Sequence, residues 1–187
     1  MSTRSRIGMV MPDGKVKSIY CHWDGYPEGV GRKLLHHYKS RKQVLDLLEL
    51  GDISSLGSFY DEDISKGDWH KFDEKNPEKR LKLMEKSENC TVAYKDRGEI
   101  CPAKIDEDEN AFIIRVTRGW EEYAYLWKRS YDGIERWHFI EAPFFNVLTE
   151  LETGVDEREK KTSEQDMGNR IVEQLGLDKD GKFLQFN

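Results

Sequence analysis

The chain has 187 residues, of which 37% are hydrophobic, 35% charged and 11% aromatic, with a formal net charge of −6. A chain of this length can form one domain whose core needs no disulfide or metal, and its aromatic content excludes a disordered protein. It contains no run of eighteen apolar residues that would span a membrane, and no apolar segment follows the N-terminal Met-Ser-Thr-Arg as in a secretory signal.

The cysteines and the charge distribution narrow the class of protein further. Cys21, Cys90 and Cys101 are odd in number and lack CxxC spacing, which is typical of a reducing compartment, so we expect a cytoplasmic protein. Residues 1–44 contain nine Lys and Arg against three Asp and Glu, which leaves the other 143 residues with a net charge of −12. This asymmetry favours a basic face for phosphate, an acidic surface for a basic partner, or charges that only solvate the elements.

The N-terminal segment carries clear local signals. Residues 7–11 and 16–23 read as strands joined by the turn Pro12-Asp13-Gly14, so the chain opens with a predicted β-hairpin. Gly25-Tyr26-Pro27 ends the hairpin. Residues 28–38 are predicted to form a helix, because proline is tolerated near a first helical turn.

A second helix is predicted directly afterwards. The capping box Ser40-Arg41-Lys42-Gln43 precedes an apolar run of helical period, and Gly51 is the expected C-terminal stop. We expect loops with short extended pieces at 52–75 and a charged helix at 77–86.

The second half of the chain is predicted to be rich in strands, at 91–94, 111–117, 123–127 and 134–140. Asp132-Gly133 is a hairpin signal between the last two strands. The run Asp106-Glu107-Asp108-Glu109 is expected to be a solvated acidic loop. The remaining segments are predicted as a strand or short helix at 143–151, a charged stretch at 157–166 and a terminal helix at 167–175.

Together these elements predict an α+β fold. The N-terminal β-hairpin and two helices would pack on an antiparallel sheet that the C-terminal hairpin strands complete, with the helices on one face. We expect residues 1–153 to form a single α+β domain and residues 154–187 a charged mobile segment with a short terminal helix.

Chemistry-bearing side chains are concentrated where the second strand ends. His22, Asp24 and Tyr26 would share one face if the strand continued to Tyr26, because alternate strand residues point to the same side. A carboxylate beside an imidazole fixes the tautomer and raises the basicity of the ring, and a phenol can donate to a developing oxyanion. The alternative is a turn with a structural role only, since Asp24-Gly25 is a common turn pair.

His36 and His37 are candidates for a second imidazole, or else solvated surface residues. They lie on different faces of the first helix, so only one can point toward the hairpin. Two imidazoles from different elements would suit RNA cleavage that needs no metal or cofactor, one deprotonating the 2′-hydroxyl and the other protonating the leaving oxygen. A zinc site that adds Cys21 and His22 is disfavoured, because adjacent pairs lack the usual ligand spacing.

Basic and aromatic side chains suggest how nucleic acid would be held. The candidates for binding phosphate are Arg4, Arg6, Arg32, Lys33 and Arg41. The aromatic residues of the C-terminal part would stack on unpaired bases, although such residues more often form a core. They are Trp120, Tyr123, Tyr125, Trp127, Tyr131 and Trp137. The chain has no Walker A loop, GxGxxG, HExxH or GxSxG motif, which argues against the common nucleotide-dependent and hydrolase mechanisms.

The opening of the chain reads Ser-Thr-Arg-Ser-Arg-Ile-Gly at 2–8, Ile-Tyr-Cys-His-Trp-Asp-Gly-Tyr-Pro at 19–27 and Gly-Val-Gly at 29–31. With these motifs it resembles a family of small phage, prophage and plasmid proteins of mostly unknown function. The later hairpin, with Tyr125-Leu126-Trp127 and Trp137, is similar to that family more loosely. The resemblance implies a mobile-element accessory protein, and some proteins of this kind are anti-CRISPR inhibitors, including inhibitors of the Cas9 system.

The leading hypothesis is a phage or mobile-element anti-defence protein of the host cytosol. It would be an anti-CRISPR protein that inactivates a Cas9-type effector by cleaving its guide RNA as a metal-independent ribonuclease. Its partner would be RNA or that ribonucleoprotein effector, and not a membrane. The alternative is a non-enzymatic acidic inhibitor that binds a basic groove of a nucleic-acid-handling defence protein. The oligomeric state stays open.

Overall fold

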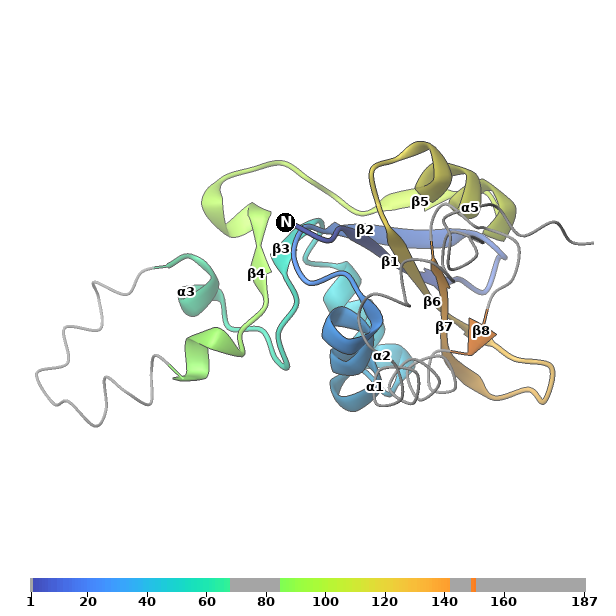
Figure 1. Ribbon diagram of the computed structural model, residues 1–187, viewed down its shortest axis with the longest axis horizontal. Coiled ribbons are helices and arrows are strands. Elements are labelled where there is room, and N and C mark those ends of the chain that lie inside the picture. Colours follow the sequence, from blue (N-terminus) through green and yellow to red (C-terminus); the bar gives the residue numbers. More distant parts are fainter. Residues whose placement is uncertain (1, 68–84, 142–148, 151–187) are drawn as a thin grey trace, which may run out of the picture.

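The computed structural model describes residues 2–67, 85–141 and 149–150. These residues form a mixed sheet of eight strands in the order β4-β3-β2-β1-β6-β7-β8, with β5 paired to β2 outside this path (Figure 1). The strands are β1 (Ser5–Val10), β2 (Val16–Cys21), β3 (Ile53–Ser55), β4 (Val92–Ala93), β5 (Lys104–Asp106), β6 (Tyr123–Arg129), β7 (Glu135–Glu141) and β8 (Thr149–Glu150).

The predicted N-terminal hairpin is confirmed. β1 and β2 pair antiparallel, with Ile7 opposite Ile19 and Arg6 opposite Tyr20. A hydrogen bond closes the turn between them, in which the Met11 amide donates to the Lys15 carbonyl at 2.7 Å. Gly14 adopts a φ of +85° in this turn, a conformation that glycine accepts without steric cost.

The α+β fold class is confirmed, and the sheet is mixed rather than antiparallel throughout. β1 pairs β6 in parallel, with Ile7 beside Tyr125, and β2 pairs β3 in parallel at Cys21 and Ile53. The predicted C-terminal hairpin is confirmed as the antiparallel pair β6 and β7. β1 therefore lies between strands from the two halves of the chain, a pairing that local sequence patterns do not specify.

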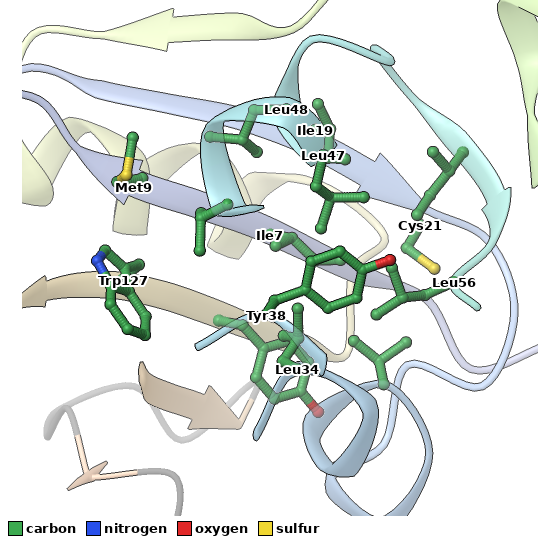
Figure 2. Close-up of a cluster of buried hydrophobic side chains, with 14 of the residues drawn as sticks. Ile7, Met9, Ile19, Cys21, Leu34, Tyr38, Leu47, Leu48, Leu56 and Trp127 are labelled. Atoms are coloured by element: carbon green, nitrogen blue, oxygen red, sulfur yellow. The ribbon is translucent and has the colours of Figure 1, made fainter. Parts of the chain in front are cut away.

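Two of the predicted helices cover one face of this sheet. A π-helical turn, Pro27–Gly31, leads into α1 (Arg32–His37), and α2 (Arg41–Leu48) follows. Figure 1 shows both helices together below the central strands. Their apolar side chains pack against the strand residues that point to this side, as Figure 2 shows for a set that includes Ile7, Ile19, Leu34, Leu47, Leu48 and Trp127. Burial of this apolar surface is the main favourable contribution to folding on this side.

The capping box begins α2 as predicted. The Ser40 hydroxyl accepts a hydrogen bond from the Gln43 amide at 3.3 Å, and the Gln43 side chain accepts one from the Lys39 amide at 3.1 Å. Gly51 follows the helix at a φ of +73°, and a Cβ at this position would lie 2.3 Å from the Cys101 carbonyl oxygen. Only glycine fits there, because both the backbone conformation and the space exclude a side chain.

The predicted strand at 111–117 is wrong, because these residues belong to helix α5 (Glu109–Arg118). Asp108 caps the helix by accepting a hydrogen bond from the Ala111 amide at 2.7 Å. Phe112 and Val116, four residues apart, form its buried stripe. A short apolar run fits a strand and a helix equally well, and here the N-cap and the four-residue spacing favour the helix.

α5 packs on the face of the sheet opposite α1 and α2, so the helices are not confined to one face (Figure 1). Its buried side chains contact a second apolar cluster made by Val16, Ala124, Leu126 and Ile140. The strands thus bury both faces, which is why β6 reads as five consecutive buried residues from Tyr123 to Trp127.

The acidic run 106–109 is solvated only in part, at the exposed Glu107 and Asp108. Asp106 is 5% exposed and pairs with Arg115 of α5 at 2.7 Å. Glu107 pairs with Lys15 at 2.9 Å, and Glu109 with Lys128 at 2.6 Å. With Asp108 as the helix cap, every acid of this run has a structural partner.

Several predictions concern regions that the structure covers only in part. The loop-like region after α2 contains β3 and the short helix α3 (Glu62–Ser65). Residues 68–84, 142–148 and 151–187 lie outside the described residues, and with them most of the predicted helix at 77–86, the segment at 143–148 and the predicted C-terminal segment 154–187. Within the described part of the chain, no helix is both long enough and apolar enough to cross a membrane.

Candidate functional site

A polar region begins on the sheet where α5 ends. Arg6 of β1 lies opposite Tyr20 of β2 and beside Ala124 of β6 in the strand register. Since Ala124 contacts the α5 cluster, strand alternation places Arg6 and Tyr20 on that same face. α5 stops at Arg118, so its apolar stripe does not extend over these two residues. The result is a patch of polar side chains beside the apolar cluster that α5 covers.

A cavity of about 580 Å³ opens at this patch, lined by Arg4, Tyr20, Gly119, Trp120 and Glu121. Trp120 is 82% exposed, whereas most tryptophans in folded proteins are largely buried. The segment that carries Trp120 is held against the N-terminus, because the Glu122 amide donates to the Arg4 carbonyl at 2.9 Å. The cavity therefore combines an exposed aromatic surface with a guanidinium group.

His22 is connected to the cavity by Tyr20, which lines the cavity and contacts the imidazole. The Tyr20 hydroxyl and the His22 Nδ1 are 2.9 Å apart, and the imidazole makes an edge-on contact with the Trp23 ring at 4.7 Å between centroids. Burial raises the pKa of Tyr20, although the nearby Arg4 lowers it, so the phenol keeps its proton at neutral pH and can donate to Nδ1. Together Tyr20 and Trp23 hold the imidazole ring in one orientation, with Nε2 as the ring nitrogen that Tyr20 does not engage.

Glu121, which lines the cavity, belongs to a buried ion pair. Arg6 donates to Glu121 Oε1 from Nε at 2.8 Å and approaches it with Nη2 at 2.7 Å. The two side chains are 10% and 5% exposed. Burial of two opposite charges is tolerated in a folded protein only when they are paired in good geometry, so this pair holds β1 and the segment before β6 in a defined relative position.

Asp52 lies at the same edge and supports β2. It accepts a hydrogen bond from the Tyr20 amide at 2.8 Å. Burial raises the pKa of Asp52, while the same hydrogen bond and the charges of Arg6 and Lys104 lower it. Asp52 is thus a second carboxylate close to Tyr20, anchored to the strand by its backbone.

The predicted shared face of His22, Asp24 and Tyr26 does not form, because β2 ends at Cys21. Asp24 adopts a φ of +57° in a turn, and its carbonyl accepts a hydrogen bond from the Val30 amide at 2.8 Å. The Tyr125 hydroxyl donates to the Gly25 carbonyl at 2.7 Å and so holds this turn against β6. The turn alternative therefore describes Asp24 and Tyr26, and His22 alone joins the site.

His36 and His37 are exposed at the end of α1. α1 packs on the opposite face of the sheet from Tyr20 and the cavity, so the structure does not bring either imidazole to His22. The zinc hypothesis is not supported either, since Cys21 is buried in the α1 cluster. In the described ranges, no group of three or more His, Cys, Asp and Glu side chains is arranged to hold a metal ion.

The five predicted phosphate-binding residues do not form one patch. Arg4 lines the cavity and Arg6 lies behind it. Lys33 donates to the Leu56 carbonyl at 2.8 Å, and Arg32 is exposed on the surface near the start of α1. Arg41 pairs with Glu135 at 2.7 Å beside a separate cavity at the other end of β1.

Sequence reasoning missed Glu121, Tyr20 and Asp52. Tyr20 had a signal, because it precedes His22 by two residues on a predicted strand. Glu121 and Asp52 had none, since their place depends on the pairing of β1 with β6 and of β2 with β3. For the C-terminal aromatic residues, the core alternative is confirmed at Tyr123, Tyr125, Trp127 and Trp137, and Trp120 and Tyr131 are exposed.

No family model, curated protein or solved structure matches this chain.

Proposed function

We propose that the protein binds RNA at the cavity lined by Arg4, Tyr20 and Trp120, and cleaves it as a metal-independent ribonuclease. The observation that carries this proposal is the oriented His22 imidazole, bonded to Tyr20, beside a cavity with a guanidinium and an exposed indole. Exposed tryptophan stacks on unpaired bases, and arginine binds phosphate through paired N–H donors.

The chemistry needs few groups. The 2′-oxygen of a ribose attacks the adjacent phosphorus, and the 5′-oxygen of the next nucleotide leaves. One group must take the proton of the attacking hydroxyl and another must supply a proton to the leaving oxygen, tasks that imidazole suits near neutral pH. Arg4 would stabilise the negative charge that grows on the phosphate oxygens.

The biological target is proposed from the resemblance of the opening segment alone. On this proposal, the RNA is the guide RNA of a Cas9-type defence effector, and the protein is an anti-defence factor of a mobile element. For the alternative, an acidic inhibitor without turnover, the acids of the run 106–109 each have a structural partner, and Glu107 is 80% exposed in its pair with Lys15. That alternative is kept as an outcome of the test.

The test incubates the purified protein with labelled single-guide RNA and with a generic structured RNA, in EDTA. We expect discrete cleavage by the wild type and its loss in His22→Ala, with the thermal midpoint nearly unchanged because His22 is only half-buried. Intact RNA, with or without the effector present, refutes the ribonuclease. Stoichiometric inhibition of the effector without cleavage would favour the binding inhibitor.

A matched pair of arginine variants tests the cavity. Arg4→Ala should weaken RNA binding about tenfold or more, since a charge-assisted contact to phosphate contributes on the order of 1.5–3 kcal/mol. Arg129→Ala removes the same charge from an exposed position at the far end of β6 and should leave binding within about twofold. Equal weakening by both variants would mean that only net charge matters and that the cavity is not the site.

A further inference from the structure

We propose that Glu121, anchored by Arg6, is the group that takes the 2′-hydroxyl proton, with His22 as the proton donor to the leaving oxygen. This inference rests on the proposed ribonuclease function and assigns the second proton-transfer group that the predicted His36 and His37 do not supply. It follows from how the two oxygens of the Glu121 carboxylate are placed.

The two oxygens of Glu121 have different surroundings. Both contacts from Arg6, through Nε and Nη2, fall on Oε1. Oε2 lies toward Gly119, since a Cβ built on Gly119 would be 1.7 Å from it. Gly119 and Glu121 both line the cavity. One oxygen is therefore held by the arginine, and the other, which Arg6 does not contact, lies beside the cavity-lining Gly119.

Arg6 has a donor left over. Its Nη1 is buried and, within the described part of the chain, has no hydrogen-bond partner. An unmade hydrogen bond on a buried cation is unfavourable, and such groups are few in folded proteins. Arg6 lies opposite Tyr20 in the strand register, directly behind the cavity.

Tyr20 connects His22 to the cavity that Glu121 lines. It lines the cavity together with Glu121, and its hydroxyl holds the His22 Nδ1 at 2.9 Å. The carboxylate thus belongs to the cavity lining, and the imidazole is bonded to a second residue of that lining. Separate positions for the base and the acid match the reaction, because the attacking and leaving oxygens lie on opposite sides of the phosphorus.

The proposed step balances without a cofactor. Glu121 takes the proton of the 2′-hydroxyl as the 2′-oxygen bonds to phosphorus. The bond from phosphorus to the 5′-oxygen breaks with its electron pair, and that oxygen takes the Nε2 proton of the His22 imidazolium. The ring is left neutral, with its Nδ1–H donating to the Tyr20 hydroxyl oxygen. The products are a 2′,3′-cyclic phosphate and a free 5′-hydroxyl, and nothing is oxidised or reduced.

The experiment compares Glu121→Gln with Glu122→Gln in the full chain. The readout is the single-turnover cleavage rate of a single-stranded RNA oligonucleotide between pH 5 and 8, with end-group analysis of the products. Affinity is measured separately with the 2′-O-methyl analogue, which has no proton to lose. Glu122→Gln is the matched control, because the exposed Glu122 is the next residue and its amide analogue keeps an acceptor oxygen.

We expect Glu121→Gln to lower the rate by about 100-fold or more, with affinity for the analogue within about twofold of the wild type. Glu122→Gln should cleave at the wild-type rate. Products other than a 2′,3′-cyclic phosphate and a 5′-hydroxyl, or an unimpaired Glu121→Gln, would overturn the inference.

Two further outcomes are kept separate. If Glu121→Gln does not fold, Glu121→Asp decides, because it retains the charge for Arg6 and withdraws the carboxylate from the cavity wall. A wild-type rate in folded Glu121→Asp overturns the inference, and a large loss supports it. If the wild type cleaves no RNA at all, the proposed function itself fails. Cleavage by the wild type is therefore measured before any variant is compared with it.

Discussion

Removing one partner of the buried Arg6–Glu121 pair should be far more damaging than removing both. Arg6→Met keeps the unbranched apolar stem but leaves the Glu121 carboxylate, 5% exposed, without its cation. Breaking a buried pair in this way costs about 3–5 kcal/mol of unfolding free energy, whereas replacing both partners by apolar residues is often neutral. The double variant Arg6→Met/Glu121→Met should therefore regain most of the stability that the single variant loses.

The assay is urea denaturation followed by tryptophan fluorescence, read as a double-mutant cycle. The coupling energy should be on the order of 3 kcal/mol. As a comparison, Lys42→Met breaks an ion pair on α2 whose side chains are 84% and 62% exposed, and it should cost less than about 1 kcal/mol. A loss below about 1 kcal/mol in Arg6→Met, or strictly additive single variants, would refute the buried pair as a structural element.

Three further predictions concern the fold around the site. Phe112→Ala, in the fully buried stripe of α5, should lower the unfolding free energy by about 3–5 kcal/mol, measured by chemical denaturation. Ile114→Ala, at a half-exposed position, should lower it by about 1 kcal/mol or less. Equal losses would contradict the helix, because residues 112 and 114 share a face only in a strand. Gly51→Ala should cost at least about 1 kcal/mol in the same assay, because its φ is +73° and the added Cβ meets the Cys101 carbonyl; an unchanged midpoint would rule this out. Because burial raises the pKa of Asp52, ionisation of this carboxyl lowers the stability of the wild type as pH rises through that pKa. The unfolding free energy of Asp52→Asn should therefore rise relative to that of the wild type between pH 4 and 7. A difference that does not change with pH would contradict the burial of Asp52.

The helix that covers the second sheet face shows why part of the fold escaped prediction. The run Ala111-Phe112-Ile113-Ile114-Arg115-Val116-Thr117 is rich in β-branched residues, which favours a strand by propensity. In the structure the run is a helix, because Asp108 caps it and Phe112 and Val116 reach one apolar surface of the sheet. Tertiary contacts outweighed a local preference that amounts to only a few tenths of a kcal/mol per residue.

The candidate site was predictable only where its residues are close in sequence. The pair of Tyr20 and His22 follows from strand alternation, and Arg4 and Arg6 from the basic opening of the chain. Their partners come from elsewhere: Glu121 is 115 residues from Arg6 along the chain, and Asp52 is 32 residues from Tyr20. His36 and His37, which sequence proximity favoured, lie on the other side of the sheet.

Local patterns thus account for the hairpin, the capped helix α2, the glycine stop at residue 51 and the α+β class, because turns, caps and periodicity depend on neighbours within a few residues. They do not account for the parallel pairing of β1 with β6, the second helical layer or the wall of the cavity. Those features depend on which distant strands share hydrogen bonds and buried surface, and that choice is made by the free energy of the whole packed chain.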